Sequence, residues 1–181
     1  MIIVLGSGHS NTVTSVTDNL GTHLAWASRG SVDQSGHQRI SEYWATFSAG
    51  GTITITVSFG SSDTNLCVVA FGISGANTNT GQTFDGSLRT AYASSAGAPS
   101  VTGVSTTNAH DMIIGLEGSR SATIETAGTS FTLIKSITST AGNGAAENNV
   151  ATSALSGATV SFGTSTSSDW AMIVDAVQRA W

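Results

Sequence analysis

Histidine side chains are the first groups in this sequence that could do metal chemistry. His9, His23 and His37 recur at intervals of fourteen residues. Such spacing could bring them onto neighbouring strands, and catalytic zinc sites use three protein ligands of this type. The spacing matches no known zinc signature, however, so histidines in exposed loops are the favoured interpretation.

Two carboxylates, Glu117 and Glu125, could form the acid and nucleophile pair of a glycosidase. Carboxylates scattered along strands are usually solvated, which argues against this pair. A serine hydrolase is not supported either, because no Gly-x-Ser-x-Gly motif occurs. We therefore expect a protein that is not an enzyme and that needs no cofactor.

Asp18, Asp63 and Asp169 are expected in loops, where carboxylate oxygens can bind calcium. No dense Asp-x-Asp run accompanies them, and a turn-capping role explains these aspartates as well. Calcium at the three positions is the weaker interpretation, and we predict no metal.

Aromatic side chains could bind a surface glycan by packing against the C–H groups of a sugar ring. Tyr43 and Trp44 are adjacent in a predicted strand, so their side chains point to opposite faces. At least one of them is expected to face solvent or another subunit, although core packing is the commoner role of such residues. Trp181 is the tryptophan that we expect at a subunit interface, because interfaces are enriched in Trp.

β-Strands are the elements that must position these side chains. Residues 52–59 alternate between Thr or Ser and apolar side chains, which is typical of a strand with one buried face. Residues 1–5 and 66–73 are continuous apolar runs, which predict central strands covered on both faces. Residues 170–181 fit a helical stripe and a strand alternation alike, and their match to residues 66–71 favours a strand.

The chain contains an internal duplication. Residues 1–5 reappear as residues 112–116, and Ser58-Phe59-Gly60 reappears as residues 161–163. A third match pairs Glu42 with Glu147. We predict one all-β domain over residues 1–181, an antiparallel jelly-roll-like β-sandwich of two repeats, at about residues 1–73 and 101–181, joined by a linker rich in Gly, Ser and Asn.

The composition is unusually poor in charge. Charged residues make up 9 %, whereas soluble domains average about 25 %. The net charge is −5 and the six basic residues are scattered, so nucleic-acid binding is not expected. No apolar stretch approaches the roughly 18 residues that span a bilayer, so membrane insertion is not expected. A Ser/Thr-rich, weakly charged surface is common outside cells, and it lowers the electrostatic cost of packing copies together.

Four segments resemble a known family: residues 15–21 (Ser-Val-Thr-Asp-Asn-Leu-Gly), 43–45 (Tyr-Trp-Ala), 49–55 (Ala-Gly-Gly-Thr-Ile-Thr-Ile) and 167–171 (Ser-Ser-Asp-Trp-Ala). They resemble an uncharacterised jelly-roll-like β-sandwich family of secreted archaeal and bacterial surface proteins and phage virion proteins. The resemblance implies an extracellular, cell-surface or virion location and carries no catalytic signature.

The second repeat is preceded by an additional predicted strand in residues 101–109, and nothing corresponds to it before Met1. Either the sequence lacks preceding residues, or the first repeat has an exposed edge or an apolar groove, which commonly pairs with another chain. We expect the edge residues Ile2, Ile3, Val4 and Leu5 to meet a strand of the next subunit.

These features predict a structural subunit of a filament or virion that forms homo-oligomers or polymers. The alternative is an adhesion module that binds carbohydrate through Tyr43 and Trp44.

Overall fold

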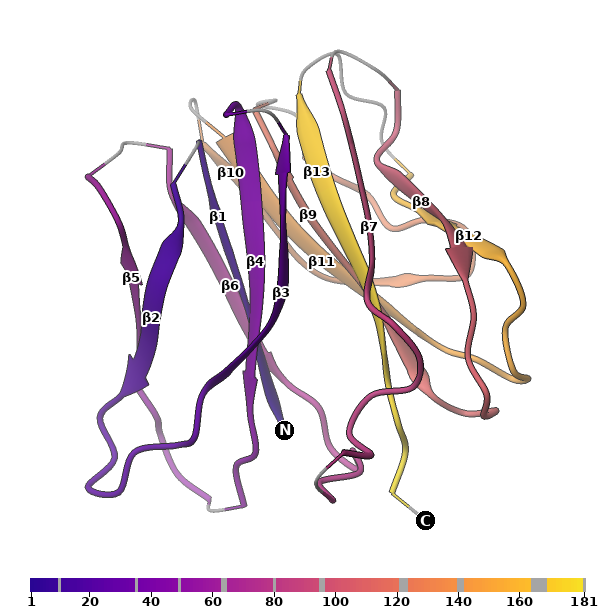
Figure 1. The fold of residues 1–181 in the computed structure, drawn as a ribbon, viewed down its shortest axis with the longest axis horizontal. Coiled ribbons are helices and arrows are strands. Elements are labelled where there is room, and N and C mark those ends of the chain that lie inside the picture. The colour runs from indigo at the N-terminus through magenta and orange to yellow at the C-terminus, as the bar shows by residue number, and fades with distance from the viewer. Residues whose placement is uncertain are drawn as a thin grey trace.

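A computed structural model describes residues 1–9, 11–34, 36–48, 50–62, 65–79, 81–94, 97–120, 124–139, 142–163 and 169–180. Within these ranges every regular element is a β-strand, and all strand pairs are antiparallel (Figure 1). The prediction of an all-β sandwich is confirmed. No helix in the described ranges is long and apolar enough to cross a membrane.

Two central sheets face each other. The first contains, in spatial order, β3 (Ala27–Gln34), β4 (Gln38–Ala45), β1 (Ile2–Gly8) and β6 (Cys67–Gly72). The second contains β10 (Thr132–Ser139), β11 (Gly142–Val150), β9 (Met112–Ser119), β13 (Trp170–Val177) and β7 (Arg89–Ala93).

Two outer strand pairs cover the outer faces of these sheets. β2 (Val13–Asp18) pairs with β5 (Ile55–Phe59) beside the first sheet, and β8 (Ser100–Val104) pairs with β12 (Ala158–Ser161) beside the second. Figure 1 shows the resulting succession of layers, with β2 and β5 on the left and β8 and β12 on the right.

Alternation along each central strand divides the apolar side chains between the layers. Ile3 and Leu5 of β1 enter the core between the two sheets, where they join residues of both repeats. Ile2 and Val4 point the other way and pack beneath β2 and β5. A third cluster packs Met172 and other residues of β13 beneath β8 and β12.

β1 is not an edge strand, which overturns one prediction. It pairs with β4 on one side and with β6 on the other, and Ile2, Ile3, Val4 and Leu5 are all buried. These four residues therefore cannot offer an unpaired strand to a neighbouring subunit. The first strand of each repeat, β1 or β9, takes a central place because both of its faces are apolar. Trp181, the other predicted interface residue, lies outside the described residues.

The duplication is visible in the hydrogen bonds. The Gly60 amide donates to the Thr12 carbonyl at 2.9 Å, and the Gly163 amide donates to the Thr126 carbonyl at the same distance. This agrees with the predicted match of the two Ser-Phe-Gly segments. The match of Glu42 with Glu147 is wrong by one residue, because Glu42 pairs with Leu5 whereas Ala146 pairs with the equivalent Leu116.

Of the other local predictions, some are confirmed and some are wrong. The carboxyl-terminal segment forms the fully buried strand β13, as predicted, and the additional strand before the second repeat is β8. Residues 142–144 have a Gly-Asn-Gly sequence that is typical of turns, yet they begin β11. Residues 66–73 were expected to form a central strand, but β6 lies at the edge of its sheet.

Candidate functional site

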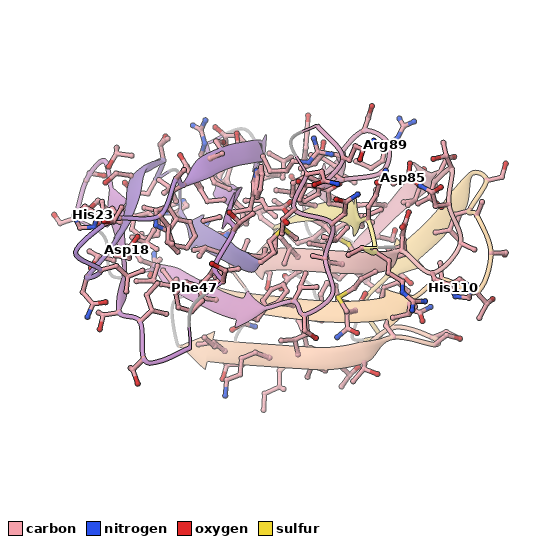
Figure 2. The ribbon with its side chains drawn as sticks, turned by 90° about the horizontal axis from the view of Figure 1, so that it is seen from below. Asp18, His23, Phe47, Asp85, Arg89 and His110 are labelled. Atoms are coloured by element: carbon pink, nitrogen blue, oxygen red, sulfur yellow. The ribbon has the colours of Figure 1, made fainter. Side chains whose placement is uncertain are left out.

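Asp18 anchors the loop that follows β2. Its carboxylate accepts hydrogen bonds from the Leu20 amide at 3.0 Å, the Leu24 amide at 2.9 Å and the Trp26 indole at 2.9 Å. The His23 ring lies 3.3 Å away, and Figure 2 shows the two side chains together. Burial acts to raise the pKa of Asp18, but the hydrogen bonds outweigh it and lower the pKa to about 2. Asp18 is therefore a loop cap.

The three histidines that were considered as zinc ligands do not converge. His9 and His37 approach each other with ring centroids 6.3 Å apart, but His23 is held by Asp18. His37 and Arg120 both contact Asp169, at 3.4 and 3.6 Å. Asp63 lies outside the described residues. Within the described part of the chain, no three His, Cys, Asp or Glu side chains gather so that they could hold a metal ion.

Glu117 and Glu125 do come close enough to interact, together with Glu147, but all three are 0 % exposed. The expectation that they are solvated is wrong. Burial, and then repulsion from Glu147, raises the pKa of Glu125 to about 7, and burial raises that of Glu147 to about 7 despite a hydrogen bond from the Gly128 amide. No substrate could reach these carboxyl groups without opening the layer above them.

A second buried acidic pair bridges the two central sheets. Asp175 of β13 and Glu42 of β4 point into the same core, and burial followed by mutual repulsion raises the pKa of Glu42 well above its usual value. Arg29 binds Asp175 in a bidentate manner, with its Nε 2.6 Å from Oδ2 and its Nη2 3.1 Å from Oδ1. Neither Glu42 oxygen has a hydrogen-bond partner among the described residues.

A cavity of about 450 Å³ opens beside this pair. The Arg29 guanidinium lies 4.4 Å from the centroid of the Phe84 ring, and Phe84 meets Trp44 edge to face at 5.3 Å. The buried hydroxyl of Thr83 has no hydrogen-bond partner among the described residues. The wall thus combines aromatic surface, a fixed cation and hydroxyl groups, and it is completed by Ala25, Thr46, Thr78, Gly81 and Gly86.

Tyr43 does not share this cavity. Its hydroxyl donates to the Val13 carbonyl at 3.3 Å, and its ring packs beneath β2 and β5. Trp44 packs instead against the core between the central sheets. The prediction that the two side chains point to opposite faces is confirmed, so they cannot form one stacking platform.

The first repeat also exposes an apolar surface. The equivalent surface of the second repeat is covered by a strand of that repeat. We call the surface of the first repeat the first-repeat groove; it has a volume of about 390 Å³ and is lined by residues of β5 and β6 and their neighbours. Its lining is Ile2, Phe47, Ile53, Ile55, Ala70, Phe71 and Gly72. Phe47, one of these lining residues, is labelled in Figure 2. Val68 on the same face of β6 is 37 % exposed.

Sequence reasoning missed both the groove's location and the buried acids. The sequence did contain a signal for the groove, because residues 66–73 are apolar on both faces although only one face is covered. Arg29 and Asp175 are separated by 146 positions, and no local pattern in the sequence connects them.

Comparison with known proteins adds little. No family model matches the chain, and no solved structure matches it. The small ribosomal subunit protein uS11 of Chlamydia abortus is 31 % identical over 71 residues, which cover 39 % of this chain and 54 % of that protein. The chain thus spans about half the length of uS11, and this similarity does not show a family.

Proposed function

We propose that this protein is a non-enzymatic structural subunit that assembles with copies of itself in an extracellular filament or on a virion surface. One observation carries the proposal: the first repeat presents an apolar groove beside a strand, β5, that is paired on one side only among the described residues. Unpaired strands beside apolar surface are usually protected in monomeric proteins, and they are common sites of strand addition between chains.

The distribution of charge supports the same proposal. Of the ten acidic residues that the structure describes, eight are buried: Asp18, Asp85, Asp111, Asp175, Glu42, Glu117, Glu125 and Glu147. The surface therefore carries few like charges that would repel an approaching copy. Threonines and serines on the exposed faces of β2 and β5 give a hydrated surface without that repulsion.

Sedimentation velocity across a range of concentrations, with negative-stain imaging of the same samples, tests this proposal. We expect oligomers or filaments whose size grows with concentration. Because apolar and backbone contacts are insensitive to salt, assembly should persist at about 1 M NaCl, where screening acts within about 3 Å. A chain that stays monomeric at every concentration would contradict the proposal.

A second candidate function, glycan binding at a cell surface, is favoured by the cavity beside Arg29. Trp44 and Phe84 offer aromatic surface, and Arg29 and Thr83 offer hydrogen-bond donors. Glycan-array binding that is lost in Trp44→Ala and kept in Tyr43→Phe, with both variants folded by circular dichroism, would support this function. The control is informative because Tyr43 lies on the opposite face of β4.

A further inference from the structure

The second repeat shows what kind of element covers the surface that is open in the first. β8 pairs with β12 and lies over β13, so the outward side chains of β13 are buried: Met172 is 0 % exposed and Val174 is 1 % exposed. The equivalent positions on β6 are Val68 and Ala70, because Val68 pairs with Gly6 and Met172 with the equivalent Glu117. Both are exposed.

The backbone edges correspond residue by residue. In β12, Ala158 pairs with Val104 and Val160 with Val101, and the Phe162 amide donates to the Pro99 carbonyl at 3.0 Å. The matching Ser-Phe-Gly segments make Ile55, Val57 and Phe59 of β5 the counterparts of Ala158, Val160 and Phe162.

Those three residues of β5 point their backbone groups away from β2. The Gly60 amide donates to Thr12 and the Thr54 carbonyl accepts from the Asn19 amide at 3.2 Å, so even-numbered residues of β5 face β2. Successive residues alternate in this respect, so Ile55, Val57 and Phe59 face outward. Their side chains are only half-buried, whereas Val160 is 3 % exposed and Phe162 is 1 % exposed.

β6 carries a further mark of an uncovered strand. Its sequence, Cys-Val-Val-Ala-Phe-Gly, is apolar on both faces, as in strands that are covered on both sides. β13 meets that expectation, since β7 pairs with its second edge and β8 lies over its outer face. Among the described residues, β6 has β1 as its single neighbour within the sheet.

We infer that the first-repeat groove binds an extended strand of a neighbouring chain, antiparallel to β5, in the place that β8 occupies in the second repeat. The inference rests on the proposed function and names its contact. The bound strand pairs with Ile55, Val57 and Phe59 through its backbone. It is uncharged, because every residue that lines the groove is apolar. It buries two apolar side chains spaced as Val101 and Val104 are in β8.

A synthetic peptide of residues 98–106, blocked at both ends and fluorescently labelled, tests this inference on the full-length chain. Its anisotropy should rise on binding, and a peptide with Val101→Asp and Val104→Asp should not bind. Ala70→Asp should weaken binding at least about tenfold, because it places a charge in the groove. Thr56→Asp is the matched control, since Thr56 is exposed on the opposite face of β5.

A second variant, Val57→Pro, removes an outward amide that β2 does not use, so the fold should survive while peptide binding weakens. If Ala70→Asp leaves peptide binding unchanged, the peptide occupies its native position beside β12 and the inference is overturned. The inference is also overturned if the peptide does not bind at all. If the chain assembles but the peptide does not bind, the inference fails and the proposed function stands. If the peptide binds to a chain that stays monomeric without it, the groove accepts a strand and self-assembly is excluded.

Discussion

Arg29 holds together the polar groups that the two central sheets bury between them. Its guanidinium binds Asp175 and also donates to the Gly86 carbonyl at 3.2 Å, while its flat face lies on Phe84. The Asp175 side chain is 1 % exposed, so water cannot stabilise its negative charge, and Arg29 is its strongest partner. Arg29 thereby joins β3, β13 and the loop before β7.

Replacing Arg29 by alanine should lower the free energy of unfolding by about 3 kcal/mol, because it leaves a buried carboxylate without its counter-ion. Urea denaturation of Arg29→Ala, Asp175→Ala and the double variant would measure this. The double variant should lose clearly less than the sum of the two single losses, since the groups interact directly. Strictly additive losses would show that the ion pair contributes nothing.

The buried acids could not be predicted from the sequence at the residue scale. Glu117 lies between Leu116 and Gly118, and Glu147 lies between Ala146 and Asn148; such neighbours also flank solvated carboxylates on many strands. What buries them is the segment at residues 124–128, which covers the outer face of the second sheet and donates the Gly128 amide to Glu147 at 2.7 Å. A shift of one residue in register would turn Glu147 to the opposite face, and the sequence match with Glu42 contained that error.

At the scale of the elements, β9 packs closely against the first sheet at Gly118. A methyl group at this position would lie 2.6 Å from Ile40 Cγ2 and 2.8 Å from Gln38 Nε2, and it would also collide with the Ser7 hydroxyl. Gln38 and Ser7 are buried and hydrogen-bonded to each other at 2.7 Å. They have little room to move aside.

Gly118→Ala should therefore push the central sheets apart and lower the unfolding free energy by about 1–3 kcal/mol. Thermal denaturation followed by circular dichroism would detect this as a lower Tm. Gly21→Ala serves as the comparison, because a methyl group at Gly21 meets nothing within 4 Å. Equal Tm values for the two variants would mean that the sheets are not closely packed at β9.

The strands with strong apolar patterns were predictable, and their neighbours were not. β1, β9 and β13 coincide with the apolar runs of the sequence, and β5 lies within the alternating segment 52–59. β3 and β7 are rich in polar and small residues, so their pairing depends on the sheets they join. The apolar run of residues 1–5 predicted a central strand, as β1 is, but no local pattern specifies that its two partners are β4 and β6.

For the whole molecule, the buried carboxyl groups set the pH dependence of stability. The pKa values of Glu125 and Glu147 are raised to about 7 by burial first of all, and that of Asp111 is raised to about 7 by burial and by its hydrogen bond with Asp85. In the unfolded chain these groups titrate near pH 4. Between about pH 4.5 and 7 the folded state therefore binds more protons than the unfolded state.

The free energy of unfolding should consequently fall as the pH rises through this window, by at most about 3 kcal/mol for each group. Urea denaturation at several pH values would show the decline. Glu147→Gln should make the decline shallower, because it removes one of the groups whose pKa is raised by burial. Stability that increases from pH 4.5 to 7 would contradict this prediction.

The same burial changes how the molecule behaves in an electric field. The formal charge of −5 counts every acid as ionised, whereas burial raises the pKa values of Glu42 and Glu117 well above the usual range and so favours their protonated forms. Near neutral pH the folded protein should therefore carry less negative charge than its unfolded chain, which lowers the force that draws it toward the anode. Its isoelectric point should lie above the value of about 5.1 that the sequence implies.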